Sequence, residues 1–343
     1  MSKTRVFIDG SAGTTGLRIF DRLSERSDIE LIGIPEEKRK ELKFRKEAIE
    51  SADAAFLCLP DAAAREIADI IENPNVKILD TSTAHRTNPD WAYGFPELSN
   101  TLRKKLEGSN RIAVPGCHAS GFCSTVAPLV MHGIIPADYP VCCTSVTGYS
   151  GGGKKMIAEY EGDSRSAALD APRQYGLSQQ HKHLPEMKVI CGLMYEPCFS
   201  PIVADFYSGM TVTVPLFTRL LSKKVTPHNV FEILAEHYAG QKLIQVTYGS
   251  EPMLDSNSFS GRDSMEISVY GNDERIIVAS QFDNLGKGAS GAAVQCFNII
   301  TGKNETEGLV QSRESSFHII ASGGFYCPCE TFLAYAQKRT WAF

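Results

Sequence analysis

The glycine-rich stretch at residues 9–16, DGSAGTTG, constrains the fold of this 343-residue chain more than any other feature. A short apolar run at residues 5–8 precedes it, which suits a buried parallel strand, and a helical pattern at residues 17–25 follows it. Small residues between a strand and a helix let the backbone approach a pyrophosphate, while the helix N-terminus supplies free N–H groups. The stretch therefore predicts a dinucleotide site, although an ordinary strand-to-helix turn is also compatible with it. The glycines in the G-x-x-G-x-x-G spacing are Gly10, Gly13 and Gly16.

Strand and helix patterns continue to alternate after this opening unit. The second strand is predicted at residues 29–34, and alternating strands and helices predict a doubly wound parallel sheet of the Rossmann type. The remaining predicted elements of this region are strands at residues 54–59, 77–79 and 111–114 and a helix at residues 62–71.

The charged run after the second strand bears on the choice of cofactor. Residues 35–40, PEEKRK, carry both signs of charge at the place where a cofactor without a 2′-phosphate usually meets a carboxylate. The three basic residues would pair with a 2′-phosphate, so we favour NADP(H) over NAD(H). A solvated run of charges explains the same residues nearly as well.

The candidate nucleophile is Cys117, which follows the predicted strand at residues 111–114 and a Pro-Gly corner. A helix running to Met131 begins there, so the thiol lies over a helix N-terminus, where unpaired N–H groups favour an anion. Such a setting predicts a lowered pKa and nucleophilic character. The alternative is a buried structural cysteine.

Polar residues at two other places are candidates for substrate binding and proton transfer. Arg86 ends the polar stretch at residues 80–86, which follows a predicted strand, so it is placed to clamp a phosphate or carboxylate; a surface arginine is the alternative. His181, His183 and Glu186 combine two imidazoles with a carboxylate at a predicted helix start. We favour an acid/base and substrate-binding role over a metal site, because the sequence offers no second cluster of ligands.

The part of the chain after Met131 predicts an α+β domain whose sheet is a plausible dimer face. The glycine-rich loop at residues 148–155 suits either an anion and the nicotinamide end of a cofactor or a flexible linker. Asn284 is placed to meet a nicotinamide carboxamide, just before a helix that extends to Ile300 and whose small residues allow close packing on the first domain. The other predicted elements are helices at 156–161 and 227–238, strands at 141–147, 210–214, 264–269 and 275–280, and an irregular segment at 172–180.

Composition narrows the class of protein. The chain is 43% hydrophobic and 22% charged, as in ordinary globular proteins, and its formal net charge is −5, which argues against nucleic acid or an anionic membrane as a partner. No apolar run approaches the length of a membrane span, and residues 1–5 lead directly into a strand without a secretory signal. We therefore expect a cytoplasmic protein whose ten cysteines are free thiols.

Five motifs together resemble one enzyme family, the N-acetyl-gamma-glutamyl-phosphate reductases, in the shorter of their two bacterial types. The wider relatives of that family are the aspartate-semialdehyde dehydrogenases, which share a two-domain plan. The similarity extends from about Arg5 to about Leu309. The motifs occur in order at residues 9–16, 115–117, 147–155, 181–186 and 283–291.

The resemblance implies the third step of arginine biosynthesis, in which NADPH reduces N-acetyl-glutamyl 5-phosphate to the 5-semialdehyde and phosphate is released. It implies that Cys117 forms a thioester with the acyl group, that His181 is the acid/base, and that Arg86 assists the departing phosphate. It further implies a homodimer or homotetramer. By the same resemblance His183, Glu186 and Arg262 lie in the substrate pocket, Gly13, Thr14, Thr15 and Gly16 form the phosphate turn, and Ser150, Gly151 and Asn284 lie near the nicotinamide.

The expected organisation has four parts. They are an NADP-binding domain at 1–116, a catalytic and dimerisation domain at 117–283, a helix returning to the first domain at 284–312, and an atypical tail at 313–343. The residues His118, Ala119 and Ser120 differ from the longer family members, and the tail matches nothing in the family. Two other functions stay open, namely another phosphorylating semialdehyde dehydrogenase, for aspartyl phosphate or a carrier-linked amino acid, and a non-catalytic NADP-binding sensor.

Overall fold

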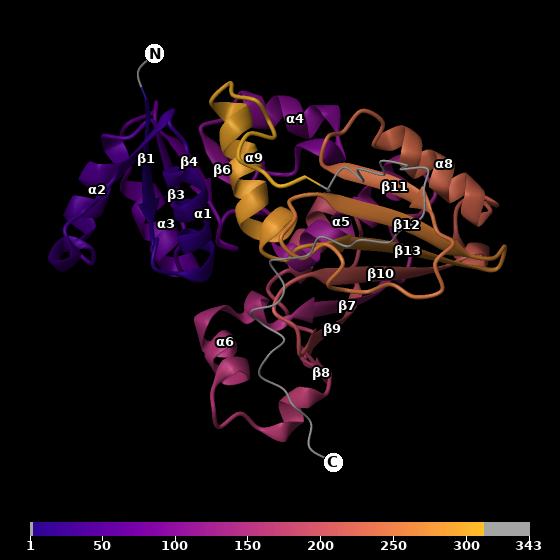
Figure 1. Ribbon diagram of the computed structural model, residues 1–343. Coiled ribbons are helices and arrows are strands. Elements are labelled where there is room, and N and C mark those ends of the chain that lie inside the picture. Colours follow the sequence, from indigo (N-terminus) through magenta and orange to yellow (C-terminus); the bar gives the residue numbers. More distant parts are fainter. Residues whose placement is uncertain (1–2, 312–343) are drawn as a thin grey trace, which may run out of the picture. The chain divides into compact units, whose positions relative to one another are not determined.

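The computed structural model describes residues 3–311, which form two β-sheets (Figure 1). The first sheet has six strands in the order β2-β1-β3-β4-β6-β5, and every neighbouring pair is parallel. The predicted doubly wound sheet is thereby confirmed. Its strands are β1 (Thr4–Asp9), β2 (Ile29–Ile32), β3 (Ala54–Leu57), β4 (Lys77–Asp80), β5 (Ala92–Tyr93) and β6 (Arg111–Ala113).

Helices cover both faces of this sheet because its strands are apolar on both sides. Alternate residues of a strand point to opposite faces. Val6 and Ile8 of β1 accordingly join a core with the helices α1 and α9, whereas Phe7 joins a second core with α2 and α3. These helices are α1 (Thr14–Ser24), α2 (Leu42–Glu50), α3 (Asp61–Ile70) and α9 (Gly291–Ile300).

The second sheet is mixed, with seven strands in the order β11-β12-β13-β10-β7-β9-β8. Its central pairs are antiparallel, while β7 pairs with β9 and β11 with β12 in parallel. The predicted α+β region is confirmed, and the strands predicted at 264–269 and 275–280 are found as the antiparallel pair β12 and β13. The strands are β7 (Cys142–Gly148), β8 (Arg173–Gln174), β9 (Cys198–Ala204), β10 (Met210–Phe217), β11 (Ile244–Tyr248), β12 (Met265–Gly271) and β13 (Arg275–Phe282).

One face of the second sheet is covered by helices and the other is open. Phe122 of α5 and Val230 of α8 pack against inward residues such as Val212 in the largest hydrophobic core. On the opposite face, Phe217 and Ile277 are exposed. The remaining helices are α4 (Asn100–Glu107), α5 (Cys117–Met131), α6 (Gly153–Glu161), α7 (Leu184–Cys191) and α8 (Pro227–His237).

The chain returns to the first sheet after β13. A turn of π-helix at Gly286–Ser290 leads into α9, and the buried residues of α9 join the core beside β1 and β3, as expected for this helix. In Figure 1 the yellow α9 lies between the indigo first sheet and the orange strands of the second.

Several elements differ from the sequence-based predictions. Strands β2 and β3 end two residues earlier than expected, and the segment at 172–180, predicted as irregular, contains β8. Helices α2 and α4 and strands β5, β9 and β11 were not predicted, although Ile244, Val246 and Tyr248 of β11 alternate with polar residues as in a half-buried strand. Eight cysteines fall within residues 3–311 and all are free thiols. The atypical tail at 313–343 lies outside the described residues.

None of the helices described here is both long and apolar enough to cross a membrane.

Candidate active site

A cavity of about 400 Å³, called here the catalytic cavity, lies where the carboxyl edge of the first sheet meets the second sheet. Its wall combines the loop after β4, the start of α5, the loop after β7, the segment before α7 and the π-helix. Residues from all five motifs therefore meet in one place, together with Arg86. Its lining includes Arg86, Cys117, Gly151, His181, His183 and Asn284.

Cys117 is the first residue of α5 and is partly exposed to this cavity. Its pKa is raised above the ordinary value by burial, while the charges of Arg86 and Lys182 and a hydrogen bond from the His118 backbone N–H oppose the rise. The expectation of a lowered pKa is therefore wrong for this structure, because desolvation outweighs the helix N-terminus and the nearby cations. The position over the helix start is as predicted.

Arg86 is buried and its guanidinium is locked in place by three acceptors. Its Nε donates to the Val114 carbonyl over 2.9 Å, Nη2 donates to the Thr81 carbonyl over 3.0 Å, and Nη1 donates to Oε2 of Glu186 over 3.0 Å. A planar fork held in this way presents its remaining N–H groups to the cavity in one orientation.

Glu186 lies behind the cavity wall rather than on it. Only 2% of Glu186 is exposed. Besides Arg86, its carboxylate accepts the Tyr93 hydroxyl over 2.8 Å and the Gly116 backbone N–H over 2.9 Å, both at Oε1. Both oxygens are thus occupied by protein donors, although the resemblance placed this residue in the substrate pocket.

Gly116 explains how these groups come so close together. A Cβ on this glycine would collide with Nη1 of Arg86 and with Nε2 of His183. The Pro-Gly corner before Cys117 is therefore needed for close packing of the arginine and the imidazole, in addition to turning the chain.

The two histidines before α7 are both in the cavity, with ring centroids 4.8 Å apart. Burial lowers the pKa of His181 to about 4, helped by the Lys182 charge, and lowers the pKa of His183 well below its ordinary value. Nδ1 of His181 accepts the His183 backbone N–H over 3.2 Å, so the neutral imidazole of His181 carries its proton on Nε2.

Three of the titratable residues that line the cavity were not predicted from the sequence. His118 and Tyr175 are hydrogen-bonded to one another, and Lys182 lies close enough to Cys117 to affect its pKa. Lys182 stands between the two predicted histidines, and His118 directly follows the nucleophile, so proximity in sequence was the available signal. For Tyr175 the sequence contains no signal of a role in the site.

The residues expected near the nicotinamide also lie together. Nδ2 of Asn284 donates to Oγ of Ser150 over 3.1 Å, and Oδ1 of Asn284 accepts the Gly209 backbone N–H over 2.8 Å. Asn284 and Gly151 line the cavity, whereas Ser150 is buried. The asparagine is thus oriented by the protein before any ligand binds.

A second cavity of about 420 Å³, called here the turn cavity, adjoins the glycine-rich turn. Gly10 has φ +83°, and a Cβ there would collide with the Cys58 carbonyl oxygen, so only glycine suits this position. Oγ1 of Thr14 is buried without a hydrogen-bond partner among residues 3–311. A bound phosphate near this helix start would provide one, which fits a dinucleotide.

Basic residues lie at the far end of the turn cavity. Arg39, Lys40 and Arg45 line it, and Arg45 is already paired with the buried carboxylate of Asp9 over 2.8 Å. Arg39 is paired with the exposed Glu36 over 2.9 Å, and Lys40 has no ion pair within residues 3–311, so both are available to a negative ligand group. Of the predicted phosphate-turn residues, Gly10 lines this cavity, Thr15 lines the catalytic cavity, and Gly13, Thr14 and Gly16 lie in the turn and first helical residues between them.

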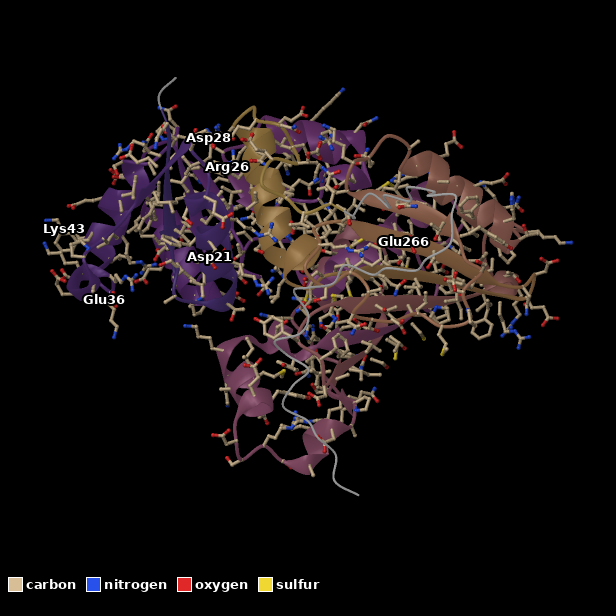
Figure 2. All side chains as sticks on the ribbon, in the orientation of Figure 1. Asp21, Arg26, Asp28, Glu36, Lys43 and Glu266 are labelled. Carbon is tan, nitrogen blue, oxygen red and sulfur yellow. The ribbon has the colours of Figure 1, made fainter. Side chains whose placement is uncertain are left out.

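Arg262, like Glu186, was predicted in the substrate pocket but lies outside the lining of the catalytic cavity within the described chain. Arg262 lies near Glu266 of β12, which is labelled in Figure 2. Burial raises the pKa of Glu266, and the Arg262 charge partly opposes this rise. Nor does the part of the chain covered by residues 3–311 hold a group of three His, Cys, Asp or Glu side chains arranged for a metal.

Comparisons with known proteins agree with this architecture. Residues 5–106 match the family model described as semialdehyde dehydrogenase, NAD binding domain, and residues 117–284 match that of the semialdehyde dehydrogenase dimerisation domain. The crystal structure of aspartate semialdehyde dehydrogenase II from Vibrio cholerae has a TM-score of 0.68 over 88% of this chain and 99% of its own, at 17% identity. At this identity the likeness concerns the fold alone.

Similar curated sequences give a narrower assignment. N-acetyl-gamma-glutamyl-phosphate reductase 2 from Nostoc sp. is 42% identical over 322 residues, covering 90% of this chain and all of that protein. N-acetyl-gamma-glutamyl-phosphate reductase from Brucella ovis is 44% identical over 309 residues, covering 88% of this chain and all of that protein. With the cysteine, the arginine and the paired histidines in one cavity, the chain belongs to the semialdehyde dehydrogenase family and, within it, to the N-acetyl-gamma-glutamyl-phosphate reductases.

Proposed function

We propose that this chain catalyses the NADPH-dependent reduction of N-acetyl-L-glutamyl 5-phosphate to N-acetyl-L-glutamate 5-semialdehyde, with release of phosphate. The substrate follows from the names of the similar reductases. The observation that supports the chemistry most directly is the meeting of Cys117, Arg86 and His181 in the catalytic cavity, with the glycine-rich turn beside it.

Cys117 acts as the nucleophile. Its sulfur attacks the acyl carbon as the thiol loses its proton, the bond from that carbon to the phosphate oxygen breaks, and the departing phosphate takes up the proton. A thioester to the enzyme remains. An acyl group held as a thioester is easier to reduce than a carboxylate. After reduction, the carbon–sulfur bond breaks, the aldehyde leaves and the thiolate is restored.

Arg86 and Lys182 supply the positive charge that this reaction needs. Both lower the pKa of Cys117, and both line the cavity in which the phosphate must depart. A guanidinium already held by Glu186, Val114 and Thr81 does not have to be reoriented when the anion arrives. Glu186 is thus proposed as a positioning residue for Arg86 rather than as a group that contacts substrate.

His181 is proposed as the proton donor. Its low pKa keeps the ring neutral at physiological pH, and its proton is on Nε2 because Nδ1 accepts a backbone N–H. In this form the ring can donate to the oxygen of the reacting carbon as negative charge develops there. His183 lies on the same wall, beside Arg86 and Gly116.

NADPH supplies the hydride when it is bound. The glycine-rich turn with the unpaired Thr14 hydroxyl fits its pyrophosphate, and Arg39 and Lys40 fit a 2′-phosphate. Asn284, held by Ser150 and Gly209, is placed to meet the nicotinamide amide.

We further propose that the chain acts in the cytoplasm on a small-molecule acyl phosphate and assembles as a homodimer or homotetramer. The open face of the second sheet, in a region that matches a dimerisation domain, supports the assembly. The division at residues 1–116, 117–283 and 284–312 accords with the two sheets and the returning helix α9.

The test is a phosphate-dependent assay in the reverse direction. The full chain is mixed with N-acetyl-glutamate semialdehyde, NADP and phosphate, and NADPH is followed by its absorbance, with Cys117→Ser alongside. We expect turnover that requires phosphate and is abolished in the variant. Turnover only with aspartate semialdehyde would refute the substrate, and NADPH binding without turnover on either aldehyde would indicate a sensor.

A further inference from the structure

The residue after the nucleophile, His118, belongs to a buried hydrogen-bonded line that the reaction described above does not use. Its Nδ1 lies 2.7 Å from Oγ of Ser145, and its Nε2 lies 2.7 Å from the hydroxyl of Tyr175. His118 is 3% exposed and Ser145 is fully buried. Tyr175 is only partly buried, because its other side lines the catalytic cavity.

The protonation of this line can be worked out from its members. Burial and the neighbouring His181 lower the pKa of His118 to about 3, so the ring is neutral and has one donor and one acceptor nitrogen. The hydrogen bonds described for residues 3–311 include no acceptor for Ser145 other than His118. The serine O–H therefore donates to Nδ1, since a buried hydroxyl hydrogen left unpaired would cost about 1–3 kcal/mol.

The remaining ring proton then fixes the direction of the next bond. With Nδ1 as acceptor, Nε2 of His118 carries the proton and donates it to the oxygen of Tyr175. Burial raises the pKa of Tyr175, and the proximity of Cys117 raises it further, so the phenol stays protonated. Its own O–H is consequently free to donate into the cavity.

We propose that Tyr175 donates a hydrogen bond to the oxygen on the reacting carbon of the acyl substrate, and that His118 and Ser145 are the residues that position it. Tyr175 and Cys117 line the same cavity, and the thiol is near enough to affect the Tyr175 pKa. The hydroxyl therefore faces the space in which the sulfur attacks the acyl carbon and an oxyanion develops. This inference rests on the proposed reaction and adds the Tyr175 hydroxyl to His181 as a second hydrogen-bond donor to the substrate oxygen.

The test compares kcat and KM of the full-length enzyme and two pairs of variants, with N-acetyl-glutamate semialdehyde, NADP and phosphate. Tyr175→Phe is expected to lower kcat about 100-fold, the effect of removing one oxyanion donor, with little change in KM. Tyr160→Phe is the matched control, because the Tyr160 hydroxyl is buried without a partner among the described residues, and it should leave kcat within twofold.

The second pair tests the role of His118. His118→Gln keeps an amide N–H near the position of Nε2 and should retain most of kcat, whereas His118→Asn reaches only the Ser145 side and should resemble Tyr175→Phe. In the double variant of His118→Asn with Tyr175→Phe the losses should not add. A role in packing alone would make the Asn and Gln variants similar and the losses additive, which would overturn the proposal.

A measurement without substrate separates this donor from a general disturbance of the site. Alkylation of Cys117 by iodoacetamide should proceed at the wild-type rate in Tyr175→Phe, because the hydroxyl acts on the substrate oxygen and not on the sulfur. If wild type shows turnover and Tyr175→Phe matches it, the proposal is wrong while the function stands. If wild type itself shows no turnover with either aldehyde, the proposed function fails first.

Discussion

The two cavities of this protein are built in opposite ways. The turn cavity is formed largely by β1, β2 and the loops that follow them, within the first 60 residues. The catalytic cavity gathers residues from Thr15 to Ala289, and its Arg86 is held by Glu186, which lies behind the wall and 100 positions away in the sequence. We propose that backbone shape recognises the cofactor in the turn cavity, whereas a network of buried side chains holds the reacting groups in the catalytic cavity.

This difference predicts which substitutions each cavity tolerates. In the catalytic cavity, exchanging a side chain that holds several others should strongly lower activity or stability. In the turn cavity, only substitutions that alter the backbone conformation should have effects of similar size. Four measurements test that contrast, in order of decreasing expected effect.

The largest effect is expected for Glu186→Gln. The amide leaves the buried Arg86 without its counter-charge, and breaking a buried ion pair costs about 3–5 kcal/mol of unfolding free energy. Urea unfolding and steady-state kinetics should show a loss of both stability and kcat. Glu305→Gln, which breaks the Arg103–Glu305 pair away from the cavity, should lower stability and spare kcat. Equal kcat losses in the two variants would mean that Glu186 has no special role in the site.

Gly10→Ala should have the next largest effect, from the side of the turn cavity. The positive φ and the collision with the Cys58 carbonyl each oppose a Cβ, and strain of this kind costs about 1–3 kcal/mol. We expect a lower urea midpoint and weaker NADPH binding by fluorescence titration. Alanine at Gly33, where a Cβ would meet nothing within 4 Å, is the control. Unchanged NADPH affinity in Gly10→Ala would contradict a turn that binds the cofactor through its backbone.

The pH dependence of stability should report the neutral histidines of the catalytic cavity. The pKa of His118 is about 3 in the folded protein, against about 6.5 unfolded, so below pH 6.5 the unfolded chain binds the extra proton. Stability is therefore present above pH 6.5 and is lost as the pH falls towards 3. In His118→Asn the slope of unfolding free energy against pH should be shallower by up to about 1.4 kcal/mol per pH unit. An unchanged slope would show that His118 is not buried as a neutral ring.

The smallest effect is expected for Arg39→Ala. Arg39 is exposed, and its ion pair within residues 3–311 is with the nearby, exposed Glu36, so its removal should leave stability unchanged. Loss of one phosphate contact should raise the KM for NADPH about five- to tenfold and leave the KM for NADH as it was. Arg275→Ala, an exposed arginine paired with Glu274, is the matched control. If both cofactors are affected equally, Arg39 does not recognise the 2′-phosphate.

The same contrast explains what could be predicted from the sequence. Strand, turn and helix follow one another in the chain around Gly10, so the local pattern was enough to predict the turn cavity. Cys117 and Arg86 could also be predicted as site residues, because both follow strands of the first sheet and the carboxyl ends of parallel strands share one edge. Tyr175 could not be found, since only the fold brings it to His118.

The charges and pKa values of the catalytic cavity could not be predicted from the sequence for a related reason. The sequence predicts the Glu186 carboxylate as a substrate-binding group, but in the folded chain both its oxygens accept hydrogen bonds from protein donors. The helix start at Cys117 suggests a lowered pKa, whereas the opposite sign arises from burial by residues distant in sequence. Local chemistry predicts which groups are present, and desolvation, a property of the whole fold, decides their charge.

Burial of the Cys117 thiol also limits what can damage this enzyme. Peroxides and other oxidants attack the thiolate far faster than the thiol, so a sulfur that stays protonated at neutral pH is a poor target. The thiolate is needed only while the sulfur attacks the acyl phosphate, when Arg86 and Lys182 favour the anion and the departing phosphate takes up the thiol proton. The resting enzyme should therefore survive oxidative stress that would inactivate a protein with an exposed, ionised cysteine.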